Sequence, residues 1–414
     1  MEYGCIGRKL THSFSKTIHN KLCGYKYELL ELEPQELKKF MTARAFKAIN
    51  VTIPYKQDVI PYLDGISEKA EKIGAVNTIV NKGGRLYGYN TDFSGLRALA
   101  DKNGIDFQGK KTVILGSGGT SKTAHAVACA GGVSAVLRVS RTARDGCIDY
   151  EALYRDHADA QILINTTPCG MFPALDGAAA DLDRLPDVCG VLDAVYNPLR
   201  SNLIMQALDR KIPAAGGLYM LVAQAVFAAE KFTDTKFCTG DIDRVFGEIM
   251  LEKENIVLTG MPGCGKTTLG QRIAKALGRE FIDIDREIVA RKKMPITEIF
   301  SLGGEPLFRD TETEVIREIS AKSAVVIATG GGAVLREENV RALRQNGRIC
   351  FINRPLDALP VTDSRPLSSD RQKLCALYDA RLPIYKKTCD FEADGAGSVE
   401  KTTEIILKEY GFES

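Results

Sequence analysis

The chain has 414 residues, of which 44% are hydrophobic and 26% are charged, as in a soluble globular protein of two or three domains. The formal net charge of +2 gives no reason to expect a nucleic acid or an anionic membrane as a partner. The sequence shows no membrane-spanning apolar run, no signal-peptide pattern and no C-x-x-C pair among its 11 cysteines. These observations predict a cytoplasmic protein with reduced thiols, and they leave its oligomeric state open.

The first ninety residues alternate short apolar runs with amphipathic ones, which predicts an α/β domain. Polar clusters follow the predicted strands and contain Ser13, Ser15, Lys56 and Asp92. From the residues alone, the serines and Asp92 could be helix caps and Lys56 could be a solvated surface lysine. The predicted strands are 3–7, 27–30, 48–51, 76–81 and 85–89, and the predicted helices are 15–24, 35–43 and 67–73.

A dinucleotide-binding turn is predicted between the apolar strand 111–115 and a helix that runs to about Ala130. The turn consists of Gly116, Ser117, Gly118, Gly119 and Thr120.

The next predicted strand, 135–139, ends in Ser140, Arg141, Thr142 and Arg144. An NAD site would place an acidic residue here, whereas a guanidinium suits the 2′-phosphate of NADP(H). The alternative is that both arginines lie on the surface without a ligand.

A phosphate-binding loop is the strongest local signal in the chain. An apolar strand ends at Gly260, and the G-x-x-x-x-G-K-T spacing places Lys266 and Thr267 at the start of a helix. The backbone of such a loop binds the phosphates of ATP, the lysine adds a positive charge, and the threonine hydroxyl reaches Mg²⁺. The predicted ATP-binding residues are Gly263, Cys264, Gly265, Lys266, Thr267 and Thr268. A glycine-rich turn without a ligand is the less favoured alternative.

Two aspartates follow the loop in a D-x-D pattern, Asp283 and Asp285. We expect both carboxylates on one side of a strand end, where one could reach Mg²⁺ and the other a substrate hydroxyl; helix capping is the alternative. Further on, the glycines at 330–332 let a ligand press against the backbone. The charged residues 248–254 mark the expected boundary between the two halves.

The first half resembles shikimate dehydrogenases through Ser13-x-Ser15, Val51-Thr52-x-Pro54-x-Lys56, Asn77-Thr78, Asn90-Thr91-Asp92 and the later blocks at 164–171, 193–198 and 216–224. The resemblance implies that Lys56 and Asp92 form the catalytic pair. It implies substrate contacts from Ser13, Ser15, Thr52, Asn77, Tyr196 and Gln224, and cofactor contacts from Thr166 and Gly217. Lys16 departs from the family, which usually has proline there.

The second half resembles shikimate kinases. By this resemblance Asp285 binds the attacking hydroxyl, Arg309 and Arg381 bind the substrate carboxylate, and Gly330, Gly331 and Gly332 line the substrate ring. Arg365 belongs to a lid that closes over ATP, and it joins Lys266 among the catalytic residues. The segment between Arg354 and Arg365 is shorter and less basic than is usual in the family.

We therefore predict an α/β fold in which a two-lobed dehydrogenase precedes a P-loop kinase domain with a parallel sheet. The dehydrogenase is expected over residues 1–250, with a substrate lobe at 1–92 and 216–247 and a Rossmann NADP lobe at 93–215, and the kinase over 251–414. The expected reactions are NADPH-dependent reduction of 3-dehydroshikimate to shikimate and its phosphorylation by MgATP, two steps towards chorismate. The alternatives are an NAD-dependent quinate/shikimate dehydrogenase, another small-metabolite kinase such as a gluconate kinase, and a nucleotide-switched binding module without catalysis.

Overall fold

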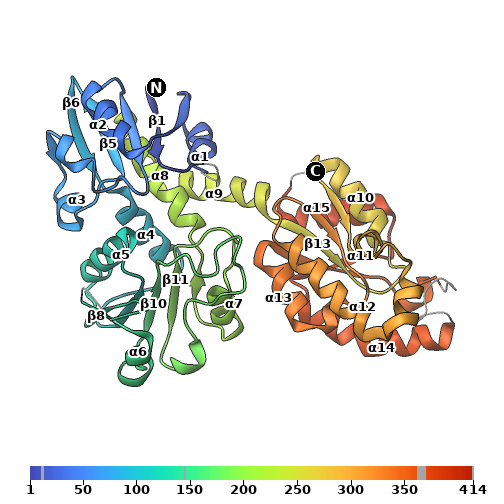
Figure 1. Ribbon diagram of the computed structural model, residues 1–414. Helices are drawn as coiled ribbons and strands as arrows, with labels where there is room; N and C mark the ends of the chain where they lie inside the picture. The colour runs from blue at the N-terminus through green and yellow to red at the C-terminus, as the bar shows by residue number, and fades with distance from the viewer. Residues whose placement is uncertain (11–13, 144–145, 361–369, 413–414) are drawn as a thin grey trace. The chain divides into compact units, whose positions relative to one another are not determined.

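The computed structural model describes residues 1–10, 14–143, 146–360 and 370–412. The chain forms two compact units, Met1–Ile249 and Met250–Ser414 (Figure 1). The expected boundary at residues 248–254 falls on the C-terminal end of a helix, α9 (Thr239–Lys253). The predictions for Ser13, Arg144 and Arg365 concern residues outside the described part of the chain.

The first lobe of the first unit is built on a mixed sheet with the strand order β2-β1-β3-β5-β6-β4. β1 pairs in parallel with β2 and β3, whereas β5 is antiparallel to β3 and β6. Ile6, Ile49 and Ile79 are buried in one hydrophobic cluster and their neighbours Cys5, Ala48 and Val80 in another, so both faces of these strands are covered. The bounds are β1 (Tyr3–Gly7), β2 (Tyr27–Glu31), β3 (Ala48–Val51), β4 (Gly65–Ile66), β5 (Thr78–Lys82), β6 (Arg85–Tyr89), α1 (Ser15–Leu22), α2 (Pro34–Ala43) and α3 (Glu68–Ile73).

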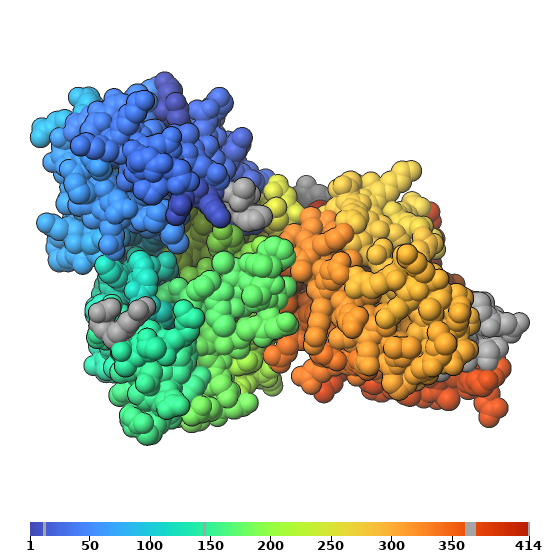
Figure 2. Space-filling view, in the orientation of Figure 1, coloured from blue at the N-terminus to red at the C-terminus, as the bar shows by residue number. Residues whose placement is uncertain are grey.

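The second lobe has an all-parallel sheet with the order β12-β11-β10-β7-β8-β9. The strand order reverses direction at β7, and in open parallel sheets ligands bind at the carboxyl ends of the strands beside such a reversal. Figure 2 shows the surface of the first lobe in blue and that of the second in teal and green. The bounds are β7 (Lys111–Leu115), β8 (Ala135–Val139), β9 (Cys147–Ile148), β10 (Ile162–Asn165), β11 (Gly190–Asp193), β12 (Ala214–Ala215), α5 (Gly119–Ala130), α6 (Tyr150–Asp156) and α7 (Asn202–Asp209).

Two packed helices connect the lobes, α4 (Thr91–Lys102) and α8 (Leu218–Thr233). α4 begins where β6 ends, and the amide of Asn90 caps it by accepting a hydrogen bond from Phe93 N. α8 returns the chain to the first lobe, where Ala228 and Phe232 pack with Tyr27 and Ala48. The residues that join the lobes therefore also lie beside the strand ends of the first sheet.

The second unit has a parallel sheet with the order β14-β15-β13-β16-β17. The phosphate-binding loop follows its central strand, β13, and leads into α10. This arrangement, together with the two sheets of the first unit, confirms the predicted α/β fold class. The bounds are β13 (Asn255–Thr259), β14 (Phe281–Asp283), β15 (Val326–Ala328), β16 (Gly347–Asn353), β17 (Phe391–Asp394), α10 (Lys266–Leu277), α11 (Ile284–Lys292), α12 (Ile296–Ser320), α13 (Glu337–Asn346), α14 (Arg371–Thr388) and α15 (Val399–Tyr410).

Candidate active sites

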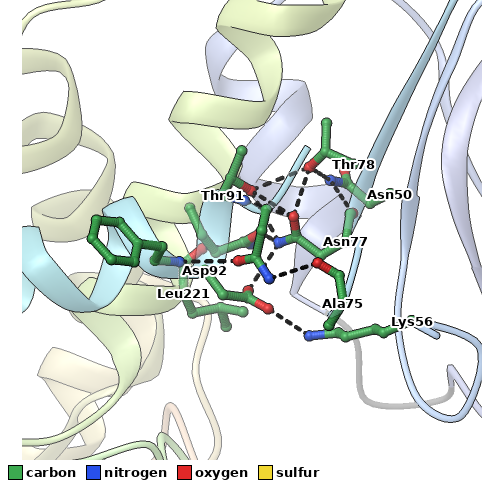
Figure 3. Close-up of polar contacts among 11 residues, drawn as sticks. Asn50, Lys56, Ala75, Asn77, Thr78, Thr91, Asp92 and Leu221 are labelled. Atoms are coloured by element: carbon green, nitrogen blue, oxygen red, sulfur yellow. Dashed lines mark hydrogen bonds and ion pairs between the residues drawn. The ribbon is translucent and has the colours of Figure 1, made fainter. Parts of the chain in front are cut away.

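An ion pair between Lys56 and Asp92 forms the centre of the first site. Lys56 Nζ lies 2.6 Å from Asp92 Oδ2, and both side chains are partly exposed (Figure 3). Lys56 follows β3, and Asp92 lies in the first turn of α4. The capping alternative for Asp92 is wrong, because Asn90 caps this helix. The Asp92 carboxylate is therefore free to face Lys56.

Asn77 holds the other oxygen of Asp92. Its Nδ2 donates to Asp92 Oδ1 at 2.9 Å and to Thr91 Oγ1 at 3.0 Å, and it lies 3.4 Å from Gln224 Oε1. Its Oδ1 accepts from the backbone N–H of Thr91 at 2.7 Å, which fixes the orientation of the amide. Gln224 reaches this group from α8, so residues far apart in the sequence meet here.

Three other expected substrate-binding residues lie on the two lobes: Ser15 and Thr52 on the first, and Tyr196 on the second. Ser15 is the first residue of α1 and hydrogen-bonds the Tyr27 hydroxyl. Thr52 directly follows β3 and is partly exposed. Tyr196, on the second lobe, packs edge-on against Phe14, with 5.4 Å between ring centroids.

A groove of about 1220 Å³ on the second lobe collects most of the expected NADP residues. Gly116, at φ +117°, has no room for a side chain, because a Cβ there would lie 2.6 Å from Thr166 Oγ1. The backbone at this turn can therefore approach a pyrophosphate closely, which fits a dinucleotide. The lining includes Gly116, Ser117, Gly118, Ser140, Arg141, Thr142 and Thr166.

The remaining expected cofactor residues lie nearby in the fold. Gly119 and Thr120 begin α5, the helix after the turn, and Gly217 precedes α8 against the Ala194 carbonyl. Two tyrosines that the sequence did not single out, Tyr150 and Tyr154, also line the groove. Their spacing on α6 offered no local signal for a ligand.

A buried carboxylate, Asp193, holds the loop that carries Tyr196. It accepts hydrogen bonds from Asn165 Nδ2 at 2.8 Å, from Val195 N at 2.9 Å and from the Ser201 hydroxyl. Burial raises the pKa of Asp193 to about 6, although these donors lower it. The sequence placed Asp193 in a family block without indicating this structural role.

The phosphate-binding loop of the second unit has the expected form. Lys266, at the start of α10, donates from Nζ to the carbonyl oxygens of Gly260 and Met261 at 2.9 and 3.0 Å. The Thr267 hydroxyl donates to Asp283 Oδ2 at 2.8 Å. Cys264 is buried beneath the loop.

The two aspartates after the loop are not placed as the D-x-D pattern predicted. Asp283 ends β14, but Asp285 already belongs to α11, so strand alternation does not relate their side chains. Asp283 Oδ1 caps α11 by accepting from Asp285 N and Arg286 N, while its other oxygen accepts from Thr267. Capping and the contact with the phosphate loop thus coexist, and both aspartates still line one pocket.

Two buried arginines face this pocket. Arg309, on α12, pairs with Glu312 at 2.7 Å and with Glu305 at 3.0 Å. Arg381 lies inside α14, which continues past Pro383. Among the described residues, Glu312 Oε1 has no hydrogen-bond partner, and burial raises the pKa of Glu312 despite its pairing with Arg309.

The glycines at 330–332 form one wall of the pocket, which we call the glycine wall. A Cβ on Gly330 would lie 2.6 Å from Glu312 Oε1 and 2.9 Å from Asp285 Oδ1, and one on Gly332 would lie 2.1 Å from Arg309 Nη2. A side chain at either position would therefore require Glu312, Asp285 or Arg309 to move. The pocket measures about 450 Å³, and its lining also includes Ile296, Phe300 and Phe308, which the sequence did not assign to the site.

Two kinds of feature are absent from the described ranges, a metal-binding cluster and a membrane-spanning helix. Those residues hold no cluster of three or more histidine, cysteine or acidic side chains able to bind a metal. In the same residues, no helix combines the length and the apolar character that crossing a bilayer requires.

Comparison with known proteins gives matches for both units. Residues 5–79 match the shikimate dehydrogenase substrate binding domain, and residues 262–410 match shikimate kinase. The chain is 38% identical over 247 residues to the NADP(+) shikimate dehydrogenase of Clostridium beijerinckii, covering 55% of this chain and 90% of that protein. A solved shikimate dehydrogenase from Peptoclostridium difficile is 33% identical, with a TM-score of 0.55 and coverage of 60% and 98%.

Another solved structure is itself a fusion. A chorismate mutase/shikimate 5-dehydrogenase from Clostridium acetobutylicum is 31% identical, with a TM-score of 0.56 and coverage of 60% of this chain and 96% of that one. The folds and sites define the class: a two-lobed dehydrogenase joined to a P-loop phosphotransferase. The chain belongs to the shikimate dehydrogenase family and continues into a shikimate kinase domain. Both resemblances noted in the sequence are thereby confirmed.

Proposed function

We propose that this chain reduces 3-dehydroshikimate to shikimate in its first unit and phosphorylates shikimate in its second. The observation that carries the proposal is the presence of two sites of different chemistry in one chain. One pairs Lys56 with Asp92 at 2.6 Å beside a dinucleotide groove. The other joins a phosphate-binding loop to a pocket with two buried arginines.

In the reduction, bound NADPH supplies the hydride that reaches the ketone carbon. As charge grows on the ketone oxygen, Lys56 gives it a proton. Asp92 keeps the Lys56 ammonium oriented, and Asn77 keeps Asp92 in place. Ser15, Thr52, Asn77, Tyr196 and Gln224 bind the substrate; Ser13 joins them by resemblance alone.

The choice of NADP(H) over NAD(H) rests on Arg141, which lines the groove after β8. Its guanidinium suits a 2′-phosphate. We expect Arg141→Ala to weaken NADPH binding tenfold or more, roughly the value of one charge-assisted hydrogen bond, and to leave NADH nearly unchanged. Steady-state KM values for both cofactors test this; equal weakening of the two would exclude Arg141 from 2′-phosphate recognition.

In the phosphoryl transfer, bound MgATP supplies the phosphoryl group. Asp285 orients the attacking hydroxyl, and Arg309 and Arg381 bind the substrate carboxylate. Lys266 neutralises charge on the phosphates. The Thr267 hydroxyl and Asp283, 2.8 Å apart, would hold Mg²⁺, which would neutralise charge on the phosphates. Arg365 acts as a lid residue only by the resemblance.

The direct test incubates the chain with 3-dehydroshikimate, NADPH and MgATP and identifies the products by mass. Shikimate 3-phosphate is expected, with shikimate alone when ATP is omitted. The alternative of a binding module without catalysis predicts no product in either case. Quinate with NAD⁺, and gluconate with MgATP, test the two remaining alternatives.

A further inference from the structure

A buried histidine lies behind the dehydrogenase site. His19, on α1, is fully buried. Its ring stacks on Tyr27, with 4.1 Å between centroids and 9° between planes, and on Phe232, at 5.5 Å and 12°. This packing holds the plane of the imidazole, so each ring nitrogen has a fixed partner. Nδ1 lies 2.7 Å from the Tyr25 hydroxyl and Nε2 lies 3.1 Å from Asn50 Oδ1.

The hydrogen bonds of Asn50 determine where the imidazole proton lies. Asn50 Nδ2 lies 3.3 Å from the Asn77 carbonyl oxygen, which can only accept a hydrogen bond. The amide oxygen of Asn50 must then face His19, and an amide oxygen also only accepts. His19 therefore carries its proton on Nε2. Burial lowers the pKa of His19 to about 3, so the ring is neutral and Nδ1 accepts from Tyr25.

A continuous run of hydrogen bonds leads from His19 to Asp92. In each bond the donor lies on the His19 side and the acceptor on the Asp92 side. Asn50 Nδ2 donates to Thr78 Oγ1 at 3.2 Å, Thr78 donates to Asn77 Oδ1 at 3.0 Å, and Asn77 Nδ2 donates to Asp92 Oδ1 at 2.9 Å (Figure 3). Aligned donors in a buried network polarise one another and favour a negative charge at the end of the run.

We propose that His19 is a positioning residue of the dehydrogenase: together with the Tyr27 hydroxyl, its Nε2–H holds the Asn50 amide at the start of the run of hydrogen bonds that ends on Asp92. This inference rests on the function proposed above. Without the Nε2–H donor, the Asn50 amide oxygen keeps only the Tyr27 hydroxyl, which donates to it at 2.7 Å, and the amide is held less firmly. A less firmly held Asn50 amide weakens the donor to Thr78 and, through Thr78, the contact with Asn77, the residue that holds Asp92.

The nitrogen spectrum of the unaltered chain tests the proton position. The chain has 4 histidines, so selective ¹⁵N-histidine labelling gives a readable spectrum, and His19→Gln identifies the His19 signals. At neutral pH we expect a proton-bearing Nε2 and a proton-free Nδ1. A proton on Nδ1, or on both nitrogens, would overturn the inference even if no variant could be assayed.

Kinetics of shikimate oxidation test the role. His19→Phe keeps a stacking ring but no donor, and it should lower kcat/KM for shikimate by about fivefold to tenfold, with the KM for NADP⁺ unchanged. His19→Gln offers an amide N–H near the Nε2 position and should stay within about threefold of the unaltered chain. Kinase activity of the same preparation gives the concentration of intact chain.

Phe232→Leu is the matched control, because it disturbs the stack and leaves the donor. It should lower the thermal midpoint as His19→Phe does, with little loss of dehydrogenase activity. Equal losses in all three variants would reduce His19 to a packing role, and full activity in His19→Phe would overturn the proposal. An unaltered chain without any dehydrogenase activity would instead refute the proposed function.

Discussion

Lys56 is the residue whose removal tests the reduction chemistry most directly. Lys56→Ala should reduce dehydrogenase turnover about a hundredfold or more, the scale of lost general-acid assistance. Kinase activity of the same chain should not change, because its site lies in the other unit. Lys72→Ala, which removes an exposed lysine paired with Glu68, is the matched control. Normal reduction of 3-dehydroshikimate by Lys56→Ala would remove Lys56 from the mechanism.

Arg309 already holds two carboxylates, and they differ in exposure. Glu312 has a side-chain exposure of 0%, whereas that of Glu305 is 47%. A partly exposed ion pair is worth little, while an unpaired buried charge is costly. An incoming substrate carboxylate is therefore expected to replace Glu305 on Arg309 and to leave Glu312 in place.

Glu305→Gln should accordingly lower the kinase KM for shikimate about twofold to fivefold, because one competitor for Arg309 is gone. Arg309→Ala should raise that KM, with the KM for ATP nearly unchanged in both variants. Glu314→Gln, an exposed glutamate on the same helix, should have no effect. A raised KM in Glu305→Gln would show that Glu305 supports binding.

At the scale of helices and strands, the elements that depend on local residue patterns could be predicted from the sequence. The strands around Ile6, the turn at Gly116 and the phosphate loop before Lys266 follow from periodicity and glycine spacing, and the structure has them all. The period-2 argument for Asp285 was wrong because α11 begins at Ile284. Arg381 lies within a helix because α14 continues through Pro383.

Contacts between segments that are distant in the sequence could not be predicted from local residue patterns. His19, for example, resembles any core histidine until α1, β2, β3 and α8 come together around it. Glu312 likewise gains its importance only where the glycine wall approaches it. In both cases, burial and a partner from another element define the role, and neither is visible in the spacing of residues.

The packing of α4 on α8 sets the position of Gln224. Gly95 of α4 lies at this contact, where a Cβ would be 2.7 Å from Met220 O and 2.9 Å from Gln224 Cβ. Gly95→Ala must push the helices apart, so it should lower the thermal midpoint of unfolding and raise the dehydrogenase KM for shikimate. Gly247→Ala, in α9 with nothing within 4 Å, should be neutral or slightly stabilising, as expected for alanine in a helix. The same response at both positions would contradict this account of the helix contact.

For the whole molecule, each unit has hydrophobic cores of its own. Ile256, Ile316 and Phe351 belong to the core of the second unit, while separate clusters fill the lobes of the first. Two residues at and just after the end of α9 are held by the rest of the second unit: Ala324 N donates to Lys253 O at 2.9 Å, and Arg348 pairs with Glu254 at 2.7 Å. A piece that represents the kinase must therefore begin at about Met250.

We predict that the fusion does not channel shikimate. Residues 1–253 and residues 250–414, made separately, should each be active. Mixed in equal amounts, they should form shikimate 3-phosphate with the same lag as the intact chain, because each unit has its own core and its own nucleotide loop. The lag is measured by following product after addition of 3-dehydroshikimate. A longer lag in the mixture, or a piece that does not fold, would show that the joining helix does more than tether.

The glycine wall also limits how the substrate specificity of this enzyme can change during evolution. Along that wall, substrate selectivity depends on the absence of side chains, and the size of an absent side chain cannot be tuned by small substitutions. Any first substitution at Gly330 or Gly332 meets a carboxylate or a guanidinium of the site itself. Elsewhere in the lining, Ile296 and Phe300 carry apolar side chains that can be exchanged for smaller or larger ones. A lineage that acquires a new substrate should therefore accumulate its changes at Ile296 and Phe300, while the glycines persist.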